Sequence, residues 1–236
     1  MATKTINLAG VGEVVITKRR KSKSMRLSIT PTGTVRVTVP FWLSYGAAEQ
    51  FVSKRVDWIV EHKSKHPESV IRPGDRIGKS HRIEFIQDPA ATSSSARVYN
   101  NLIKVKSPKL YTDKLVQQKA VKASEKALKA EAEVLLPQRL EYFSKQHNLA
   151  YKSVKIKKLT SRWGSCSAHG DITLSYFLMQ LPWDLIDYVL VHELVHTKHM
   201  HHGPDFWDAM EQLKPGARKV RKLLNANLPR IKPEPI

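Results

Sequence analysis

The chain has 236 residues, with 40 lysine and arginine against 21 aspartate and glutamate side chains, which gives a formal net charge of +19. Its single cysteine, Cys166, excludes an internal disulfide, and the sequence contains neither a signal-peptide-like start nor an apolar run of about 18 residues or more. We therefore expect a soluble, cytoplasmic protein that buries a real core and has no membrane partner.

The N-terminal part of the chain alternates apolar and polar residues over short segments, a pattern typical of β-strands. Predicted strands cover residues 14–16, 25–29, 34–39, 70–86 and 97–105. Turns are expected at Pro31-Thr32-Gly33 and over residues 88–95, and a helix over residues 46–62. Residues 1–108 are accordingly expected to form a basic, β-rich region with one helix.

The C-terminal part, residues 109–236, is expected to be an α+β region that ends in a basic tail. A helical pattern runs over residues 111–146, with Pro137 as an expected kink or break. Strands are expected at 154–159 and 172–175, the second forming a hairpin with the segment around Trp163-Gly164-Ser165-Cys166.

Positive charge gathers in two runs, Lys18-Arg19-Arg20-Lys21-Ser22-Lys23 and Arg218-Lys219-Val220-Arg221-Lys222. Such runs can neutralise phosphates and release counterions, so nucleic acid, a ribosome or an acidic protein surface are candidate partners. The alternative is a solvated hairpin tip and tail that keep the protein in solution.

The segment His192-Glu193-Leu194-Val195-His196, followed by His202, contains the donors of a catalytic zinc site. Histidines four residues apart on a helix lie on one face, so both imidazoles can reach one metal ion. A catalytic zinc takes three protein ligands and leaves a position for water, and His202 can supply the third if the chain turns back after Thr197. Glu193 would then activate the zinc-bound water for hydrolysis of a peptide bond.

The surrounding sequence predicts the helix that this motif needs. Leu181-Pro182-Trp183-Asp184 is typical of a helix start, and apolar residues continue a helical period as far as Leu194. The alternative is a core helix whose histidines are merely hydrogen-bonded.

Several further segments, in the same order, resemble those of the YgjP-like metallopeptidase family, which is related to the SprT-like and WLM zinc peptidases. The matching segments are Arg162–Ser167, Gly170–Leu174, Leu181-Pro182, Ile186–Val189, the motif 192–196, His202 and Phe206-Trp207. The resemblance implies a zincin-like α+β fold and a zinc-dependent peptidase, with His192, His196 and His202 as ligands and Glu193 as the catalytic residue. The chain departs from the family at His201-His202-Gly203, where Asn-His-Ser is common.

The predicted hairpin suggests how a substrate could bind. An extended peptide can add a strand to an exposed sheet edge, so Ile172 and Thr173, together with Trp163 and Gly164, are candidate substrate-binding residues. For the aromatic side chains, core packing is the favoured interpretation.

Two other function classes stay open at this point. Some zinc-dependent endoribonucleases use three histidines at the same spacing but lack the motif's glutamate. A nucleic-acid-binding protein with a structural zinc would need a fourth ligand, which His199, His201 or Cys166 would have to supply.

Overall fold

The computed structural model describes residues 2–29, 34–65, 70–226 and 229–231. The chain divides into two compact units, unit 1 (Met1–Ser69) and unit 2 (Val70–Ile236). Both contain helices and strands, which confirms the expected mixed α+β class. The division lies near residue 69 rather than near the expected 108, because the strands of residues 76–107 share one core with the C-terminal helices.

Unit 1 is a four-stranded sheet with two helices. Its elements are β1 (Ala2–Leu8), β2 (Gly12–Arg19), β3 (Arg26–Ile29), β4 (Val35–Pro40), α1 (Tyr45–Ser53) and α2 (Val56–Lys65). The strand order is β1-β2-β4-β3, with β2 and β4 parallel. Alternate residues in the middle of β2 and along β4 are buried in the core, as the alternating pattern predicted; these residues are Val14, Ile16, Val35, Val37 and Val39.

The predictions for unit 1 were confirmed for three strands and modified for the helix. The sequence did not indicate β1, which pairs antiparallel with β2. The helix expected over 46–62 is two helices: α1 ends at Ser53 with Lys54 as its C-cap, and α2 begins at Val56. The expected turn at 31–33 lies outside the described residues.

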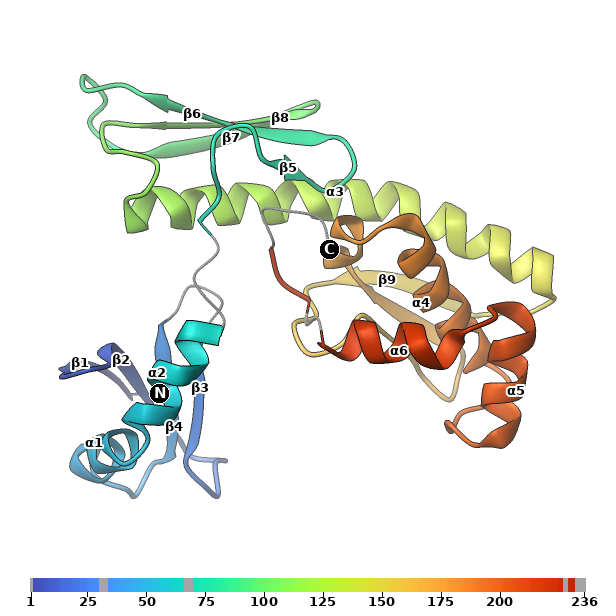
Figure 1. Cartoon of the computed structure of the whole chain (residues 1–236), viewed down its shortest axis with the longest axis horizontal. Helices are drawn as coiled ribbons and strands as arrows, with labels where there is room; N and C mark the ends of the chain where they lie inside the picture. The colour runs from blue at the N-terminus through green and yellow to red at the C-terminus, as the bar shows by residue number, and fades with distance from the viewer. Residues whose placement is uncertain (1, 30–33, 66–69, 227–228, 232–236) are drawn as a thin grey trace. The chain divides into compact units, whose positions relative to one another are not determined.

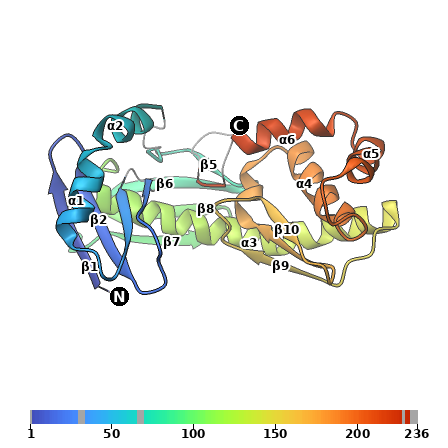
Figure 2. The same ribbon diagram turned by 90° about the horizontal axis from the view of Figure 1, so that it is seen from below.

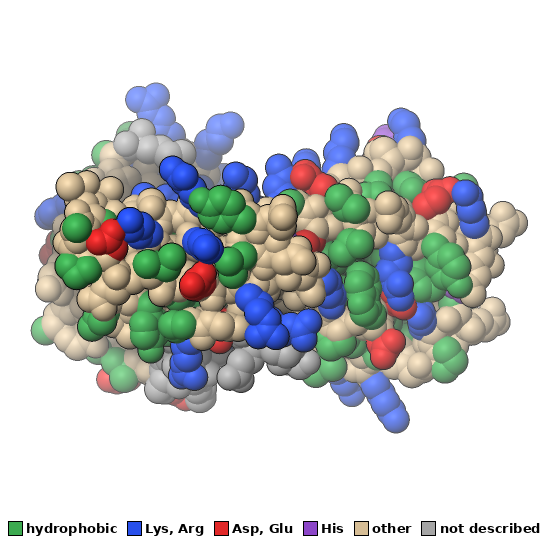
Figure 3. Space-filling view, turned by 90° about the horizontal axis from the view of Figure 1, so that it is seen from above, with side chains coloured by type: hydrophobic (Ala, Val, Ile, Leu, Met, Phe, Trp, Pro, Cys, Tyr) green, Lys and Arg blue, Asp and Glu red, His purple; other side chains and the backbone are tan. Residues whose placement is uncertain are grey.

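The second sheet opens unit 2 and lies on one long helix. Its strands are β5 (Arg76–Ile77), β6 (His81–Gln87), β7 (Ser95–Tyr99) and β8 (Leu102–Ser107), in the order β5-β6-β8-β7. One face of the sheet packs against α3 (Lys114–His147) through Ile77, Ile83, Ile103 and Val105 (Figure 1). Seen from above, Lys and Arg side chains are spread over the opposite face, with fewer acidic ones among them (Figure 3).

Helix α3 is 34 residues long and runs through Pro137, where a kink or break was expected. Its buried side is rich in alanine and leucine, both of which favour the helical conformation. Leu136 and Leu140, on either side of the proline, are both fully buried. This packing holds the helix together where proline removes one backbone hydrogen bond.

The C-terminal elements form a third, smaller sheet and a group of helices. They are β9 (Ser153–Lys157), β10 (Gly164–Cys166), β11 (Asp171–Ser175), the 3-10 helix η1 (Tyr176–Gln180), α4 (Trp183–Val195), α5 (Pro204–Leu213) and α6 (Ala217–Ala226). The sheet order is β10-β11-β9, and β10 lies beside α4 (Figure 2). No helix in the described ranges is both long and apolar enough to span a bilayer.

A charged pair fixes α4 to α3. The Arg139 guanidinium on α3 donates from Nε and Nη2 to the two carboxylate oxygens of Asp187 on α4, the second bond at 2.8 Å. Asp187 is buried, so this bidentate pair is more shielded from water than a surface ion pair. It sets the position of the helix that carries the metal-binding motif.

The tight turn between β5 and β6 predicts a large stability difference between two glycine substitutions. Gly78 has φ +70°, and a Cβ there would lie 2.2 Å from Glu131 Oε2. This oxygen accepts a hydrogen bond from the Lys79 amide, and Oε1 of the same carboxylate accepts one from the Ser80 amide. Gly74, with φ +88°, has open space around it. We expect Gly74→Ala to lower the free energy of unfolding by about 1–2 kcal/mol and Gly78→Ala by at least about 2 kcal/mol more. Denaturant unfolding of both variants measures this difference, and equal losses would contradict the tight contact with Glu131.

Candidate metal centre

Helix α4 places two histidines of the motif on one face. Pro182 precedes the helix and Asp184 lies in its first turn, as the sequence predicted. His192 lies in the last turn and His196 ends the helix, so the two rings lie one turn apart with centroids 4.8 Å from each other. Ile186, Leu190 and Leu194 are fully buried and anchor the helix in the core.

His202 comes to the same place from the loop between α4 and α5. Its Nε2 lies 3.1 Å from His192 Nε2, and the possible ligand atoms of His192, His196 and His202 all lie within 4.8 Å of one another. The chain does turn back after Thr197, as this arrangement requires. Phe206 packs against all three rings at centroid distances of 4.6 to 4.9 Å.

The protonation of the three histidines suits metal binding. Burial, with smaller contributions from His196 and His202, lowers the pKa of His192 to about 3. Burial also lowers the pKa of His196 and of His202. His196 Nδ1 lies 3.0 Å from the carbonyl oxygen of His199 and is placed to donate a hydrogen bond to it. Nε2 of the same ring is then unprotonated and available to bind a metal. Three neutral imidazoles that meet at one point fit zinc.

Glu193 is buried beside this cluster. Burial raises the pKa of its carboxyl to about 8, against an opposing effect of Arg162. Its Oε2 has no hydrogen-bond partner within the described part of the chain. A buried polar atom without a partner is costly, unless a water or a substrate group supplies the missing hydrogen bond.

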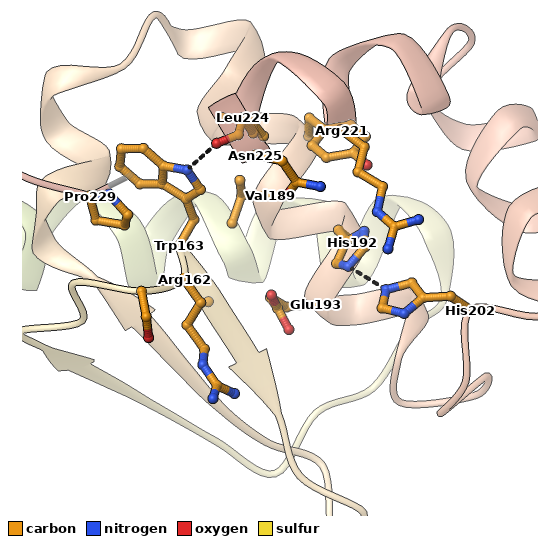
Figure 4. Close-up of a pocket in the computed structure, with 13 residues that line it drawn as sticks. Arg162, Trp163, Val189, His192, Glu193, His202, Arg221, Leu224, Asn225 and Pro229 are labelled. Atoms are coloured by element: carbon orange, nitrogen blue, oxygen red, sulfur yellow. Dashed lines mark hydrogen bonds between the residues drawn. The ribbon is translucent and has the colours of Figure 1, made fainter. Parts of the chain in front are cut away.

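The backbone of β10 lies directly against Glu193. A Cβ at Gly164 would be 2.6 Å from Glu193 Oε1 and 2.8 Å from its Cγ. Only glycine therefore leaves room for this carboxylate. A cavity of about 370 Å³ lies at this contact, and its lining includes Gly164, Glu193, His192 and His202. Arg162 and Arg221 lie on its two sides (Figure 4).

Two of the four candidate substrate-binding residues line this cavity. Gly164 and Trp163 do so, and the Trp163 indole also donates to the carbonyl of Leu224 at 3.3 Å. Trp163 is 9% exposed, so core packing describes it better than substrate contact alone.

The other two candidates do not reach the cavity. Ile172 and Thr173 belong to β11, which is the central strand and pairs with β10 on one side and β9 on the other. Ile172 is also fully buried. An added peptide strand has no free edge at these residues, so the expectation that they bind substrate in this way was wrong. The edge strand next to Glu193 is β10.

The residues considered as a fourth ligand lie outside the cluster. Within the described ranges, the metal-binding group consists of His192, His196 and His202, without His199, His201 or Cys166. Burial, with the nearby acids Glu193 and Asp171, raises the pKa of Cys166 to about 11, so its thiol is protonated at neutral pH. A zinc bound here would keep an open position, as catalytic sites do.

Sequence reasoning missed Tyr188, Asn225 and the site role of Arg221 in this cavity. Tyr188 lies one turn before His192 on α4, and its hydroxyl has no hydrogen-bond partner in the described structure. Its position four residues before the first histidine could have indicated it. Arg221 was noted only as part of a basic run, although apolar Val220 and Leu224 in the same segment are spaced as on a helix.

The arrangement predicts which of two neighbouring histidines matters for zinc. We expect His202→Gln to weaken zinc binding by more than about 100-fold, beyond the loss typical of groups that only orient a ligand. His201→Gln should leave the affinity nearly unchanged, because His201 lies outside the cluster. Competition with a chromogenic chelator measures both affinities, and a larger loss for His201→Gln would reassign the third ligand.

Comparisons with known proteins find two similar solved structures and one matching family model. The chain resembles the metallopeptidase zymogen abylysin of Pyrococcus abyssi, with 26% identity over 42% of this chain and 99% of that one, and a TM-score of 0.37. It also resembles the metallopeptidase zymogen jannalysin of Methanocaldococcus jannaschii, with 18% identity over 37% and 91% of the two chains, and a TM-score of 0.33. No protein of curated function matches in sequence. The YgjP-like metallopeptidase domain model matches residues 23–227, and the chain therefore belongs to the YgjP-like family, as its motifs suggested.

Proposed function

We propose that this chain is a zinc-dependent metallopeptidase of the HExxH type, in which His192, His196 and His202 hold the metal and Glu193 is the catalytic residue. One observation carries the proposal. Glu193, a buried side chain with an unpartnered carboxylate oxygen, lines the same cavity as His192 and His202, and the possible ligand atoms of these two histidines and His196 lie within 4.8 Å of one another. Membership of a metallopeptidase family supports the reaction class.

The chemistry of the site is proton transfer at Glu193. When bound, zinc supplies Lewis acidity that polarises a carbonyl and acidifies water. A carboxyl with a pKa of about 8 can both take and give a proton near neutral pH. Glu193 would take the proton from the attacking water and deliver it to the leaving amine, so that one water is consumed for each peptide bond broken.

Substrate would bind along β10. This strand forms the edge of its sheet and begins at Gly164, whose backbone lies against Glu193. A peptide in extended conformation can pair with such an edge through its main chain, which demands little of its side chains. Arg162 and Arg221 put two positive charges on the cavity walls, where they favour electron-rich groups of the substrate.

The experiment that tests this function compares the zinc-loaded wild type with Glu193→Gln on an unfolded protein substrate. The amide keeps the size of the side chain but cannot accept the proton, so hydrolysis should fall by at least about 100-fold. Zinc content, measured in both proteins, should be equal because Glu193 is outside the cluster. Equal hydrolysis rates at equal zinc would remove Glu193 from the mechanism, and no hydrolysis by the wild type would count against the peptidase itself.

A further inference from the structure

The strand pairing of unit 1 brings two segments of the chain to one end of its sheet. Since β2 and β4 are parallel neighbours, their last residues, Arg19 and Pro40, lie opposite each other. The segment after β2 and the segment after β4 therefore leave the sheet at the same end. Strand β3 runs antiparallel to β4 and begins there as well, with Arg26 opposite Thr38.

This end of the sheet gathers positive charge. Its exposed basic side chains are Arg19, Arg20, Lys21, Lys23 and Arg26. In sequence, residues 14–48 contain seven basic residues and no acidic one. Glu13 lies at the opposite end of β2, across from Asn7. Within the described part of unit 1, none of the five basic side chains forms an ion pair, so their charge is uncompensated.

Two large aromatic side chains are exposed at the same end. Phe41 and Trp42 directly follow β4 and are 54% and 60% exposed. Their rings contact each other edge to face, with centroids 5.5 Å apart. Neither belongs to the core of unit 1. The two rings leave apolar surface exposed to water, and a ligand with flat apolar faces would cover that surface.

We propose that this basic-aromatic surface (Arg19, Arg20, Lys21, Lys23, Arg26, Phe41 and Trp42) binds single-stranded nucleic acid. The cations neutralise phosphates, and the two rings stack on unpaired bases. A duplex hides the faces of its bases, and an acidic protein surface would use the charges but leave the rings unexplained. A membrane would need a wider apolar face than two rings among cations and serines provide.

The surface gives the chain a means of recruitment. Nucleic acid bound there would bring the enzyme to proteins that are bound to the same nucleic acid. This recruitment role rests on the proposed peptidase function, whereas the binding of nucleic acid does not. Binding should therefore be equal in wild type and in Glu193→Gln, with or without zinc.

The test is binding of the full chain to labelled oligothymidylate and oligouridylate of about 16 nucleotides, a length within the usual range of single-strand sites, at several salt concentrations. Phe41→Ala/Trp42→Ala should weaken binding at least about tenfold with little change in salt dependence. Arg20→Gln/Lys21→Gln/Lys23→Gln should lower the slope of log affinity against log salt by about 2, since each phosphate contact contributes about 0.7. Trp42→Phe keeps an aromatic face and should bind nearly as well as wild type.

A matched control removes the same charge elsewhere. Lys119, Lys122 and Lys126 are exposed on α3 of unit 2, and changing all three to glutamine should leave binding within about twofold if the surface, not net charge, is responsible. Equal weakening by both triple variants would overturn the proposal. So would unchanged binding by the ring variant, equal affinity for a duplex of the same length, or binding to phosphatidylserine vesicles without binding to either oligonucleotide.

Discussion

The contact between the backbone of β10 and the carboxylate of Glu193 is the constraint on which the site depends. Gly164 leaves space for the side chain, whereas a Cβ at this position would lie only 2.6 Å from Oε1. The strand thus closes one side of Glu193 while the other oxygen stays without a partner. Burial raises the pKa of the Glu193 carboxyl, and the close contact with β10 holds the carboxyl in one position. A residue that transfers protons requires both a suitable pKa and a fixed position.

The rest of unit 2 keeps α4 in position for that contact. The Arg139–Asp187 pair joins α4 to α3, and α3 in turn packs against strands of both sheets in the unit. Helix α5 supplies Phe206, which packs against all three imidazoles, and the Trp207 indole donates to the carbonyl of His202 at 3.1 Å. The loop that carries His202 is therefore held in place by its contacts with α5.

Local patterns in the sequence predicted much of this site, whereas non-local pairing escaped them. The spacing of His192, Glu193 and His196 is fixed by helix geometry, so the motif and its helix could be predicted directly. By contrast, β11 becomes the central strand because β9 pairs with it in parallel, and no local pattern reveals that choice. The same holds for the unit boundary near residue 69, which depends on how the second sheet packs against α3. Pro137 does not end α3, because Leu136 and Leu140 are buried in the core on either side of it.

The most direct measurement compares Gly164→Ala with Gly203→Ala, in zinc content and in kcat on an unfolded protein substrate. Both glycines lie close to the candidate centre, but a Cβ at Gly203 meets nothing within 4 Å. If the position of Glu193 governs the reaction, Gly164→Ala should keep its zinc and lose at least about tenfold in kcat, as small misplacements of catalytic groups do, while Gly203→Ala stays near wild type. Full activity of Gly164→Ala at equal zinc would contradict the account.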